Sequence, residues 1–301
     1  MNTRVNSVSF LNIQPKQSPN FKSNARFYRL PNGAGMETFT YFFREDLQWK
    51  NFIPFIKDHF QNLPKVRIIN AACSDGTEAF SLIIALRELL KGENYDKFLP
   101  IKAYDIDDEV LRAANSGYIL VNPDDVYEIK RYTKKMDKYL EKDNEDILKI
   151  PQNGMCELID GNVFLAQSTY KVNKRLRKQV DFDYGDIFNV LGNYVDNGDT
   201  ILFFRNTLGH FDENKRNDFI KLAANKLKAG SLLIIGNFDT NSVFLLENKI
   251  TTAGFTQVMK NVYEKDSETK FLIKRIKKAV NDKCCKAIDL INDLLYADNK
   301  S

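Results

Sequence analysis

Two stretches of the sequence combine small residues with carboxylates at a spacing that suits a bound ligand. Residues 66–81 read VRIINAACSDGTEAFS, an apolar run followed by small side chains that leave a ligand room to approach the backbone. Residues 101–107 read IKAYDID, a second apolar run that ends in Asp105 and Asp107. A doubly wound sheet builds a nucleotide-type pocket from such a strand, turn, helix and second strand. The chemistry we expect here is the binding of a nucleoside-containing cofactor.

The charge of the first turn indicates which cofactor would bind. The amino end of the following helix would normally favour a phosphate, but Asp75 and Glu78 lie there and would repel one. The turn contains a single glycine, Gly76, so neither glycine-rich phosphate-binding motif is present. S-adenosylmethionine has no phosphate, and its sulfonium, ammonium and ribose hydroxyl groups suit acidic side chains. The sequence therefore favours S-adenosylmethionine over nicotinamide cofactors or ATP.

Asp105 has two possible roles. At the end of the second strand it could bind the ribose hydroxyls, as an acidic residue does in dinucleotide-binding folds. Alternatively, it could cap the helix that begins near Asp107 or Asp108. We expect the ribose role.

The elements that position these residues belong to an α/β fold. Apolar runs at 66–69, 200–204 and 231–235 fit buried parallel strands. Apolar residues recur at helical spacing after residue 77 and after Asp212, which predicts helices that pack on the sheet. Residues 255–265 and 269–277, on either side of a polar turn at 266–268, are expected to form an antiparallel hairpin.

Four blocks, in order between Phe39 and Ile276, resemble the CheR-type chemotaxis-receptor glutamate methyltransferases, which use S-adenosylmethionine. The family pattern T-x-F-F-R matches residues 40–44, and A-G-C-S-T-G-E-E-P-Y-S matches residues 71–81. Its acidic second strand matches residues 105–118, and C-R-N-V-L-I-Y-F matches residues 204–211. The chain departs from the family at Thr77, Ala79, His210 and residues 236–239 (Gly-Asn-Phe-Asp, where the family has G-H-S-E).

The resemblance implies a set of functional residues. Those expected to bind the cofactor are Thr40, Ala72, Cys73, Ser74, Gly76, Glu78, Asp105, Ile106, Asp186, Ile187 and Asn206. Asp186 could accept a hydrogen bond from the adenine amine, although a plain turn residue is a comparable interpretation. Cys73 is expected to be a small residue packed under the ligand and not a nucleophile.

Two further residues are expected to act on the methyl acceptor. The arginine of T-x-F-F-R lies near the methyl group in the family, so Arg44 is expected to orient an acceptor carboxylate; the alternative is a structural ion pair with Glu45 or Asp46. His210 replaces the family's tyrosine, and it could donate a hydrogen bond to the acceptor or be a partly buried structural histidine.

The resemblance also implies the architecture. We expect an α/β, doubly wound, mostly parallel seven-stranded Rossmann-like methyltransferase sheet with an antiparallel C-terminal hairpin and a small inserted subdomain. The expected divisions are a flexible N-terminal arm (1–35), a methyltransferase domain (36–276, with the inserted subdomain at about 122–179) and a C-terminal helix (277–301). Within the insert, residues 130–142 are expected to be helical. In the family, the insert helps to dock protein substrates. The basic cluster at 171–178 is either a solvated face or a binding patch.

Composition limits the remaining possibilities. With 43% hydrophobic and 28% charged residues, the chain is typical of a soluble globular protein. It has neither a run of about 18 apolar residues nor a secretory signal, so we expect a cytoplasmic protein without membrane insertion. A net charge of +4 that is spread along the chain does not favour a nucleic-acid partner. Two histidines and four cysteines without a C-x-x-C pair predict no metal site, and the oligomeric state is left open.

The expected function is therefore transfer of a methyl group from S-adenosylmethionine to a glutamate carboxylate of a receptor-like protein. Two alternatives stay open. One is a methyltransferase that acts on a small molecule or nucleic acid, and the other is a cofactor-binding scaffold without catalysis. The departures at Thr77, Ala79, His210 and Asn237 motivate the second alternative.

Overall fold

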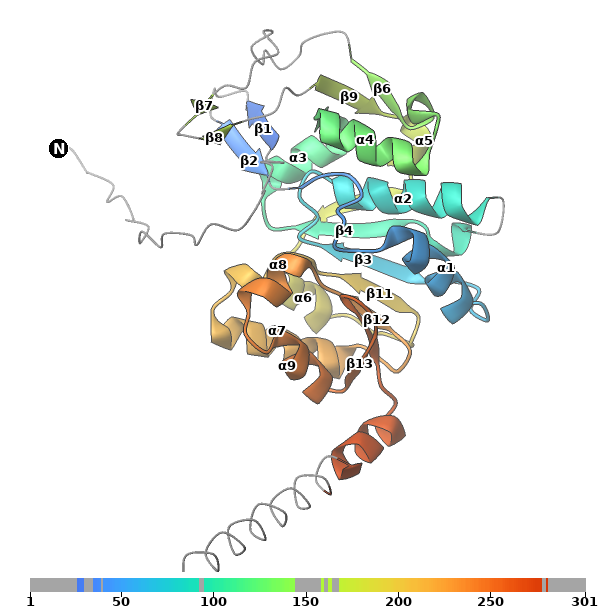
Figure 1. Cartoon of the computed structure of the whole chain (residues 1–301), viewed down its shortest axis with the longest axis vertical. Helices are drawn as coiled ribbons and strands as arrows, with labels where there is room; N and C mark the ends of the chain where they lie inside the picture. Colours follow the sequence, from blue (N-terminus) through green and yellow to red (C-terminus); the bar gives the residue numbers. More distant parts are fainter. Residues whose placement is uncertain are drawn as a thin grey trace, which may run out of the picture.

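The computed structural model describes residues 26–29, 35–38, 40–91, 95–143, 158–159, 162–163, 168–277 and 280. Its main body is a twisted sheet with helices on both faces (Figure 1). Most of the expected N-terminal arm and most of the expected C-terminal helix lie outside the described residues.

The central sheet has seven strands, and the first five in the spatial order below run parallel. They are β10 (Val180–Tyr184), β4 (Ile101–Asp105), β3 (Arg67–Ala71), β11 (Thr200–Phe203), β12 (Leu232–Ile234), β14 (Val262–Lys265) and β13 (Phe255–Met259). The strand β14 is antiparallel to both of its neighbours. This arrangement confirms the predicted doubly wound, mostly parallel sheet with an antiparallel C-terminal hairpin.

Helices cover the two faces of the sheet because neighbouring strand residues point to opposite sides. Ile68 packs in the cluster that includes residues of α1 (Trp49–His59) and α2 (Thr77–Leu90). Ile69 packs in a second cluster with residues of the helices on the other face. Those helices are α6 (Ile187–Gly192), α7 (Glu213–Lys226) and α9 (Leu246–Thr252), while α3 (Asp108–Ser116) and α8 (Asn237–Ser242) begin just after β4 and β12.

Between β4 and β10 the chain builds a second, three-stranded sheet. It consists of β5 (Tyr118–Val121), β9 (Ser168–Val172) and β6 (Leu140–Lys142) in that spatial order, together with α4 (Pro123–Tyr132) and α5 (Lys174–Arg177). The helix expected over 130–142 ends at Tyr132, and a short 3-10 turn (Met136–Lys138) and β6 follow. That prediction was wrong because Leu140 and the residues after it pair with β9.

Two short antiparallel strand pairs complete the described strands. β1 (Arg26–Arg29) pairs with β2 (Gly35–Thr38), and β7 (Leu158–Ile159) pairs with β8 (Asn162–Val163). The first pair falls partly within the N-terminal segment, which was expected to have no fold of its own. Two further 3-10 turns are Asp96–Phe98 and Leu208–His210.

The C-terminal hairpin exists, but its strands are not the expected ones. β13 and β14 pair across Lys260 and Asn261, and residues 268–277 are helical. The reason lies in Asp266, whose carboxylate binds Lys274 at 2.7 Å and Lys270 at 3.1 Å, one and two turns along the helix. The helix thus begins well before the expected start at Lys277.

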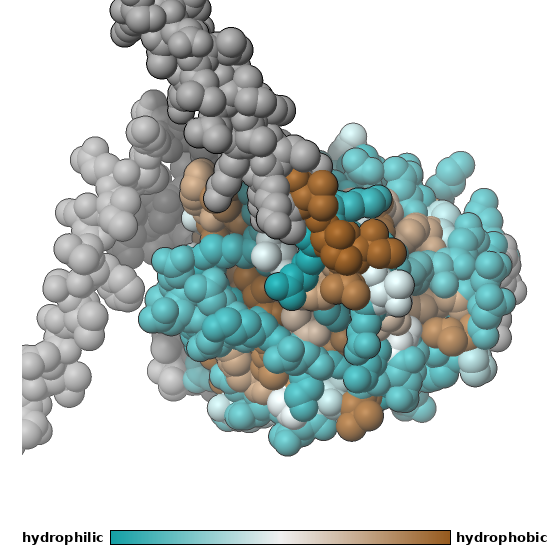
Figure 2. All heavy atoms as spheres, turned by 90° about the horizontal axis from the view of Figure 1, so that it is seen from below, coloured by the Kyte–Doolittle hydropathy of each residue, from teal (hydrophilic) through white to brown (hydrophobic). Residues whose placement is uncertain are grey.

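The surface at this end of the molecule is mostly hydrophilic, with a hydrophobic patch beside the undescribed residues (Figure 2). Among described residues 268–277 and 280, the exposed large apolar side chains are Leu272, Ile273, Ile276 and Val280. Within the described ranges, none of the helices is long and apolar enough to cross a membrane.

Candidate active site

The candidate site lies where the connections of the sheet change direction. From β3 the chain moves to β4 and β10 on one side, and β11 and β12 lie on the other side. Open α/β sheets bind ligands at the carboxyl ends of the strands at such a switch point. The residues that follow β3, β4, β10 and β11 meet at this edge, and they include most of the residues that were expected to bind the cofactor.

The turn after β3 is held in an uncommon backbone conformation. Ala72, Ser74 and Gly76 all have positive φ, at 54°, 53° and 84°. A side chain at Gly76 would place its Cβ 2.5 Å from the Phe182 ring, so only glycine fits there. Cys73 is buried, and burial raises the pKa of its thiol well above the ordinary value. The thiol therefore stays protonated, which agrees with a packing role.

Asp105 links the ends of the first two strands. Its carboxylate accepts hydrogen bonds from the backbone N–H of Ser74 at 2.8 Å and of Asp107 at 3.2 Å. The cap of α3 is instead Asp107, which accepts from the N–H of Glu109 at 2.9 Å. The cap role considered for Asp105 thus belongs to Asp107. Burial raises the pKa of Asp105, and these hydrogen bonds oppose the rise. The neighbouring Ile106 is exposed at this edge.

Asp75 faces the protein interior and does not line the ligand side of the turn. Its carboxylate accepts hydrogen bonds from the Thr77 N–H at 3.0 Å and from the Thr77 hydroxyl at 2.5 Å. Further along α2, the Ser81 hydroxyl donates to the Thr77 carbonyl and accepts from the Phe43 N–H. This chain of bonds ties the turn to the loop that carries Thr40 and Arg44.

Glu78 lies among several polar and charged side chains. One carboxylate oxygen accepts from the Asn70 amide at 2.6 Å, and the other binds the Arg205 guanidinium. Burial raises the pKa of Glu78 to about 7, against the lowering effects of Arg44 and of the Asn70 hydrogen bond, and Asp239 raises it further. The carboxyl group can therefore change its ionisation near neutral pH.

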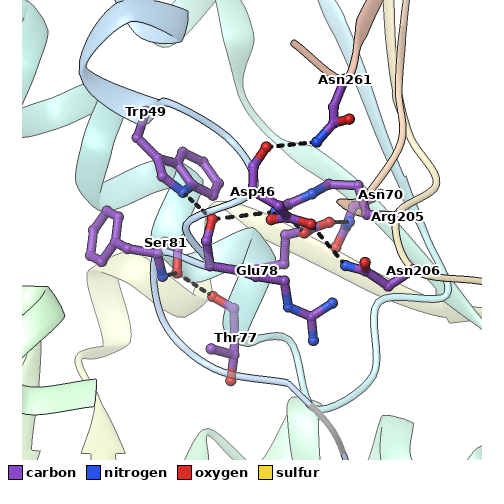
Figure 3. Close-up of polar contacts among 12 residues, drawn as sticks. Asp46, Trp49, Asn70, Thr77, Glu78, Ser81, Arg205, Asn206 and Asn261 are labelled. Atoms are coloured by element: carbon purple, nitrogen blue, oxygen red, sulfur yellow. Dashed lines mark hydrogen bonds and ion pairs between the residues drawn. The ribbon is translucent and has the colours of Figure 1, made fainter. Parts of the chain in front are cut away.

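Asp46 joins several loops at the centre of the site (Figure 3). Its carboxylate binds the Arg205 guanidinium, and it accepts from the Asn206 amide at 3.2 Å and from the Asn237 N–H at 3.1 Å. Its backbone carbonyl accepts from the Asn261 amide at 2.8 Å. One carboxylate thus fixes residues that lie 159 or more positions away in the sequence.

Asp239 holds the loop after β11, although the family pattern has glutamate at this position. It is buried and accepts from the N–H groups of Asn206 at 2.7 Å, Gly236 at 2.9 Å and Gly209 at 3.2 Å. Asn206 has a φ of 57°, so this loop also contains a residue in the left-handed backbone conformation. The aspartate that replaces the family's glutamate thus keeps a carboxylate within hydrogen-bond distance of these backbone N–H groups.

The two residues expected to act on the acceptor lie in different surroundings. Arg44 is partly buried, with its guanidinium 5.1 Å from the centre of the Tyr41 ring. Asp46, the partner considered for it, binds Arg205 instead. His210 is exposed and not partly buried, and its ring lies 4.7 Å from that of Phe238. His210 and Phe238 are both departures from the family pattern, and they contact each other.

The remaining expected residues lie at the edges of the site. Asp186 caps α6 by accepting from the Phe188 N–H at 2.7 Å, while Ile187 and Thr40 are buried. Asp186 also lines a hollow of about 520 Å³ that runs along the sheet beside α6. Tyr104 and Tyr194 contribute to its wall.

Sequence reasoning missed three residues of this site, Asn70, Arg205 and Asn261, and considered Asp46 only as a partner of Arg44. Arg205 directly precedes Asn206 in the block at 204–211, and this position next to an expected cofactor-binding residue could have indicated its role. The pairing of Asp46 with Arg205 spans 159 residues and has no signature in the sequence.

Comparison with known proteins gives a family match over most of the chain. The model of the CheR methyltransferase SAM-binding domain matches residues 38–160 and 161–258. A chemotaxis protein methyltransferase of Borreliella burgdorferi is 26% identical over 208 residues, which cover 67% of this chain and 64% of that protein. A chemotaxis protein methyltransferase of Listeria monocytogenes is 24% identical over 200 residues, covering 65% and 62%. The chain thus spans just under two thirds of the length of these relatives.

Among solved structures, a TehB-like SAM-dependent methyltransferase from Corynebacterium glutamicum aligns with a TM-score of 0.35 and 10% identity. The alignment covers 72% of this chain and 88% of that one. The strand order of the central sheet defines the fold.

Proposed function

Because the chain belongs to the CheR methyltransferase SAM-binding domain family, we propose that it transfers a methyl group from S-adenosylmethionine to a glutamate carboxylate on a protein. The observation that carries this proposal is the pair of carboxylates at the switch point. Asp105 and Glu78 flank the left-handed turn after β3, at the edge where such sheets bind nucleoside ligands.

The chemistry of these groups fits a cofactor that carries positive charge and ribose hydroxyls. Asp105 can accept further hydrogen bonds from hydroxyl groups, and an ionised Glu78 suits a cationic group. The Asn70 side-chain oxygen is buried and has no hydrogen-bond partner among the described residues, so it offers one more acceptor next to Glu78. We propose that these groups hold the cofactor, together with Thr40, Ala72, Cys73, Ser74, Gly76, Ile106, Asp186, Ile187 and Asn206.

In the proposed reaction, the side chains mainly align the acceptor. When bound, S-adenosylmethionine supplies a methyl group that its sulfonium has already activated. A glutamate acceptor is ionised at neutral pH and needs no general base. Arg44 would orient this carboxylate through its guanidinium, and His210 would donate a hydrogen bond to it at the exposed rim. Alignment of the two reactants then accounts for most of the rate.

The acceptor protein would dock on the inserted sheet. Its basic residues are concentrated at 171–178, which contain five Lys and Arg and no Asp or Glu, whereas residues 118–178 together have a net charge of +2. We therefore propose an acidic protein surface as the docking partner.

The cytoplasmic location and the expected domain limits remain predictions from the sequence.

Titration calorimetry with S-adenosylhomocysteine tests cofactor binding first. We expect binding at micromolar concentration for the unmodified protein and none for Asp105→Ala. If millimolar ligand does not bind the unmodified protein, the cofactor proposal fails.

Catalysis is tested separately with Arg44→Ala. We expect this variant to lose at least about tenfold in turnover, since it loses the group that orients the acceptor. Arg44 also lowers the pKa of Glu78, so affinity for S-adenosylhomocysteine is compared at pH 9, where Glu78 is ionised, and should stay within about twofold there. Methyl transfer to a carboxylate would release methanol in mild base. Methylation that survives base would point to another acceptor, and binding without turnover on any acceptor would point to a scaffold.

A further inference from the structure

The buried guanidinium of Arg205 lies in the site but has no role in the proposed reaction. We propose that Arg205, held by Asp46, is a positioning residue that fixes the Glu78 carboxylate and keeps it ionised for a cationic cofactor. This inference rests on the proposed function and extends it to residues that do not touch the acceptor.

The geometry ties Arg205 to both carboxylates at once. One terminal nitrogen binds Glu78 and the other binds Asp46, and the Arg205 side chain is only 1% exposed. Glu78 lies in the first turn of α2, Asp46 precedes α1 and Arg205 follows β11, so one guanidinium joins three segments (Figure 3). Because its two terminal nitrogens form a rigid fork, Arg205 fixes the orientation of Glu78 as well as its distance.

A purely structural role explains this cluster poorly. Buried ion pairs are often no more stabilising than well-packed apolar residues, because desolvation offsets their attraction. A second Arg–Asp pair lies at the amino ends of β3 and β11, where Arg67 binds Asp199 at 2.6 Å. That pair is more exposed, at 33% and 19%, and it lies far from the carboxyl ends of the strands. Of these two Arg–Asp pairs, the Arg205–Asp46 pair is the enclosed one, with side chains that are 1% and 5% exposed.

The charges around Glu78 show what Arg205 contributes. Arg44 and Asp46 face this region from the loop before α1, Arg205 from the end of β11, and Asp239 from α8. Without Arg205, Glu78 would face two carboxylates and a single arginine. Removal of a neighbouring cation raises the pKa of a carboxyl group, so Glu78 would be protonated at neutral pH. A neutral Glu78 would no longer attract a cationic ligand.

The single tryptophan of the chain offers a readout that needs no ligand. Trp49 donates its indole N–H to the Arg44 carbonyl at 3.2 Å, and the Arg205 guanidinium lies 5.7 Å from the centre of its ring. We expect the fluorescence of Trp49 to titrate near pH 7 in the unmodified full-length protein and to lose this step in Glu78→Gln. In Arg205→Gln the midpoint should move up by about one pH unit or more, and Arg205→Lys should restore part of the shift.

Calorimetry with S-adenosylhomocysteine between pH 6 and 9 gives the second readout. We expect Arg205→Gln to bind at least tenfold more weakly at pH 7 and to recover as the pH rises. Arg67→Gln is the matched control, because it breaks an Arg–Asp pair at the opposite end of β11, and its affinity should follow that of the unmodified protein. If Arg205→Gln fails to fold, Arg205→Lys takes its place, because it keeps the positive charge without the two-pronged contact, and its Trp49 midpoint should still lie above that of the unmodified protein.

Two outcomes would overturn the inference. One is a Trp49 titration that stays in place when Arg205 is replaced. The other is an affinity loss that is equal at every pH, which would mean that Arg205 only supports the fold. A failure of the proposed function looks different, because the unmodified protein would then not bind S-adenosylhomocysteine while the Trp49 titration would still shift in Arg205→Gln.

Discussion

Glu78 shows how one residue can link stability to ligand binding. It lies at the amino end of α2, between Asn70 and Arg205, and burial raises its pKa from 4.5 to about 7. In an unfolded chain the same carboxyl group would titrate near its ordinary value. The folded protein therefore holds a proton more tightly than the unfolded chain between these two values.

The first prediction concerns the pH dependence of stability. Because the folded-state pKa of Glu78 is raised, its contribution is fully present below about pH 4.5 and is lost as the pH rises through about 7. The shift corresponds to about 3 kcal/mol in the free energy of unfolding. Denaturant unfolding at several pH values should show this decline in the ligand-free protein and a weaker decline in Glu78→Gln.

Glu88 provides the matched control on the same helix. Burial alone would raise its pKa, but hydrogen bonds from Tyr139 and Lys138 lower it overall. Glu88→Gln should therefore leave the decline between pH 5 and 7 intact. If both variants weakened the decline of the free energy of unfolding with pH to the same extent, the role given to Glu78 would be contradicted.

At the scale of elements, Asp266 decides how the chain leaves the sheet. It follows β14 and binds Lys270 and Lys274 of the C-terminal helix, while the Lys274 ammonium group also donates to Thr256 in β13 at 2.5 Å. Burial alone would raise the pKa of Asp266, but hydrogen bonds from Lys274, Thr256 and Lys270 lower it overall. A single carboxylate thus fastens the helix to the edge hairpin.

The second prediction is that Asp266→Asn loosens this helix. The variant removes the negative charge that both ammonium groups bind, which should cost about 1–3 kcal/mol in the free energy of unfolding. Because the pKa is lowered, this stability is present above about pH 3.8 and disappears as the pH falls through the folded-state value. Hydrogen exchange of residues 268–277 should accelerate in the variant at neutral pH.

Asp181→Asn serves as the comparison, since Asp181 pairs with Lys102 at 2.7 Å on an exposed part of the sheet. Exposed pairs of this kind contribute about 0–1 kcal/mol. Equal losses in both variants would show that Asp266 has no special role in holding the helix.

At the scale of the whole molecule, charge is distributed unevenly. Within the insert, residues 171–178 carry five Lys and Arg and no Asp or Glu, whereas the carboxylates of the site lie at the edge of the main sheet. Exposed Lys174 and Arg175 at the start of α5 belong to the basic part. An acidic acceptor protein would be attracted to the insert, and this attraction would weaken as salt screens it.

The third prediction separates docking from cofactor binding. Raising the salt concentration from about 0.05 to 0.3 M should increase the KM for an acidic protein acceptor several-fold and leave the Kd for S-adenosylhomocysteine almost unchanged. Charge reversal by Lys174→Glu with Arg175→Glu should have the same effect on KM at low salt. Lys221→Glu on α7, with a side chain that is 73% exposed, is the control, and an equal effect there would mean that only net charge matters.

The sequence determined the sheet and most of its helices because their signals are local. Apolar runs such as 200–204 and the turn of small residues after β3 each have a pattern of their own, and the four ordered blocks fixed how they follow one another. Local signals failed where strand pairing outweighed the helical propensity of the sequence. At 130–142 the expected helix is cut short because Leu140 and the residues after it pair with β9.

Tertiary structure decided which charges meet. The sequence placed Glu78 and Asp105 in the site, but it could not show that Asp46 binds Arg205 or that Asp107 caps α3 in place of Asp105. Residues 159 positions apart become partners only because the loop before α1 lies against the end of β11. Burial at that edge removes water from the carboxylates, so their ionisation depends on neighbours that only the folded chain brings together.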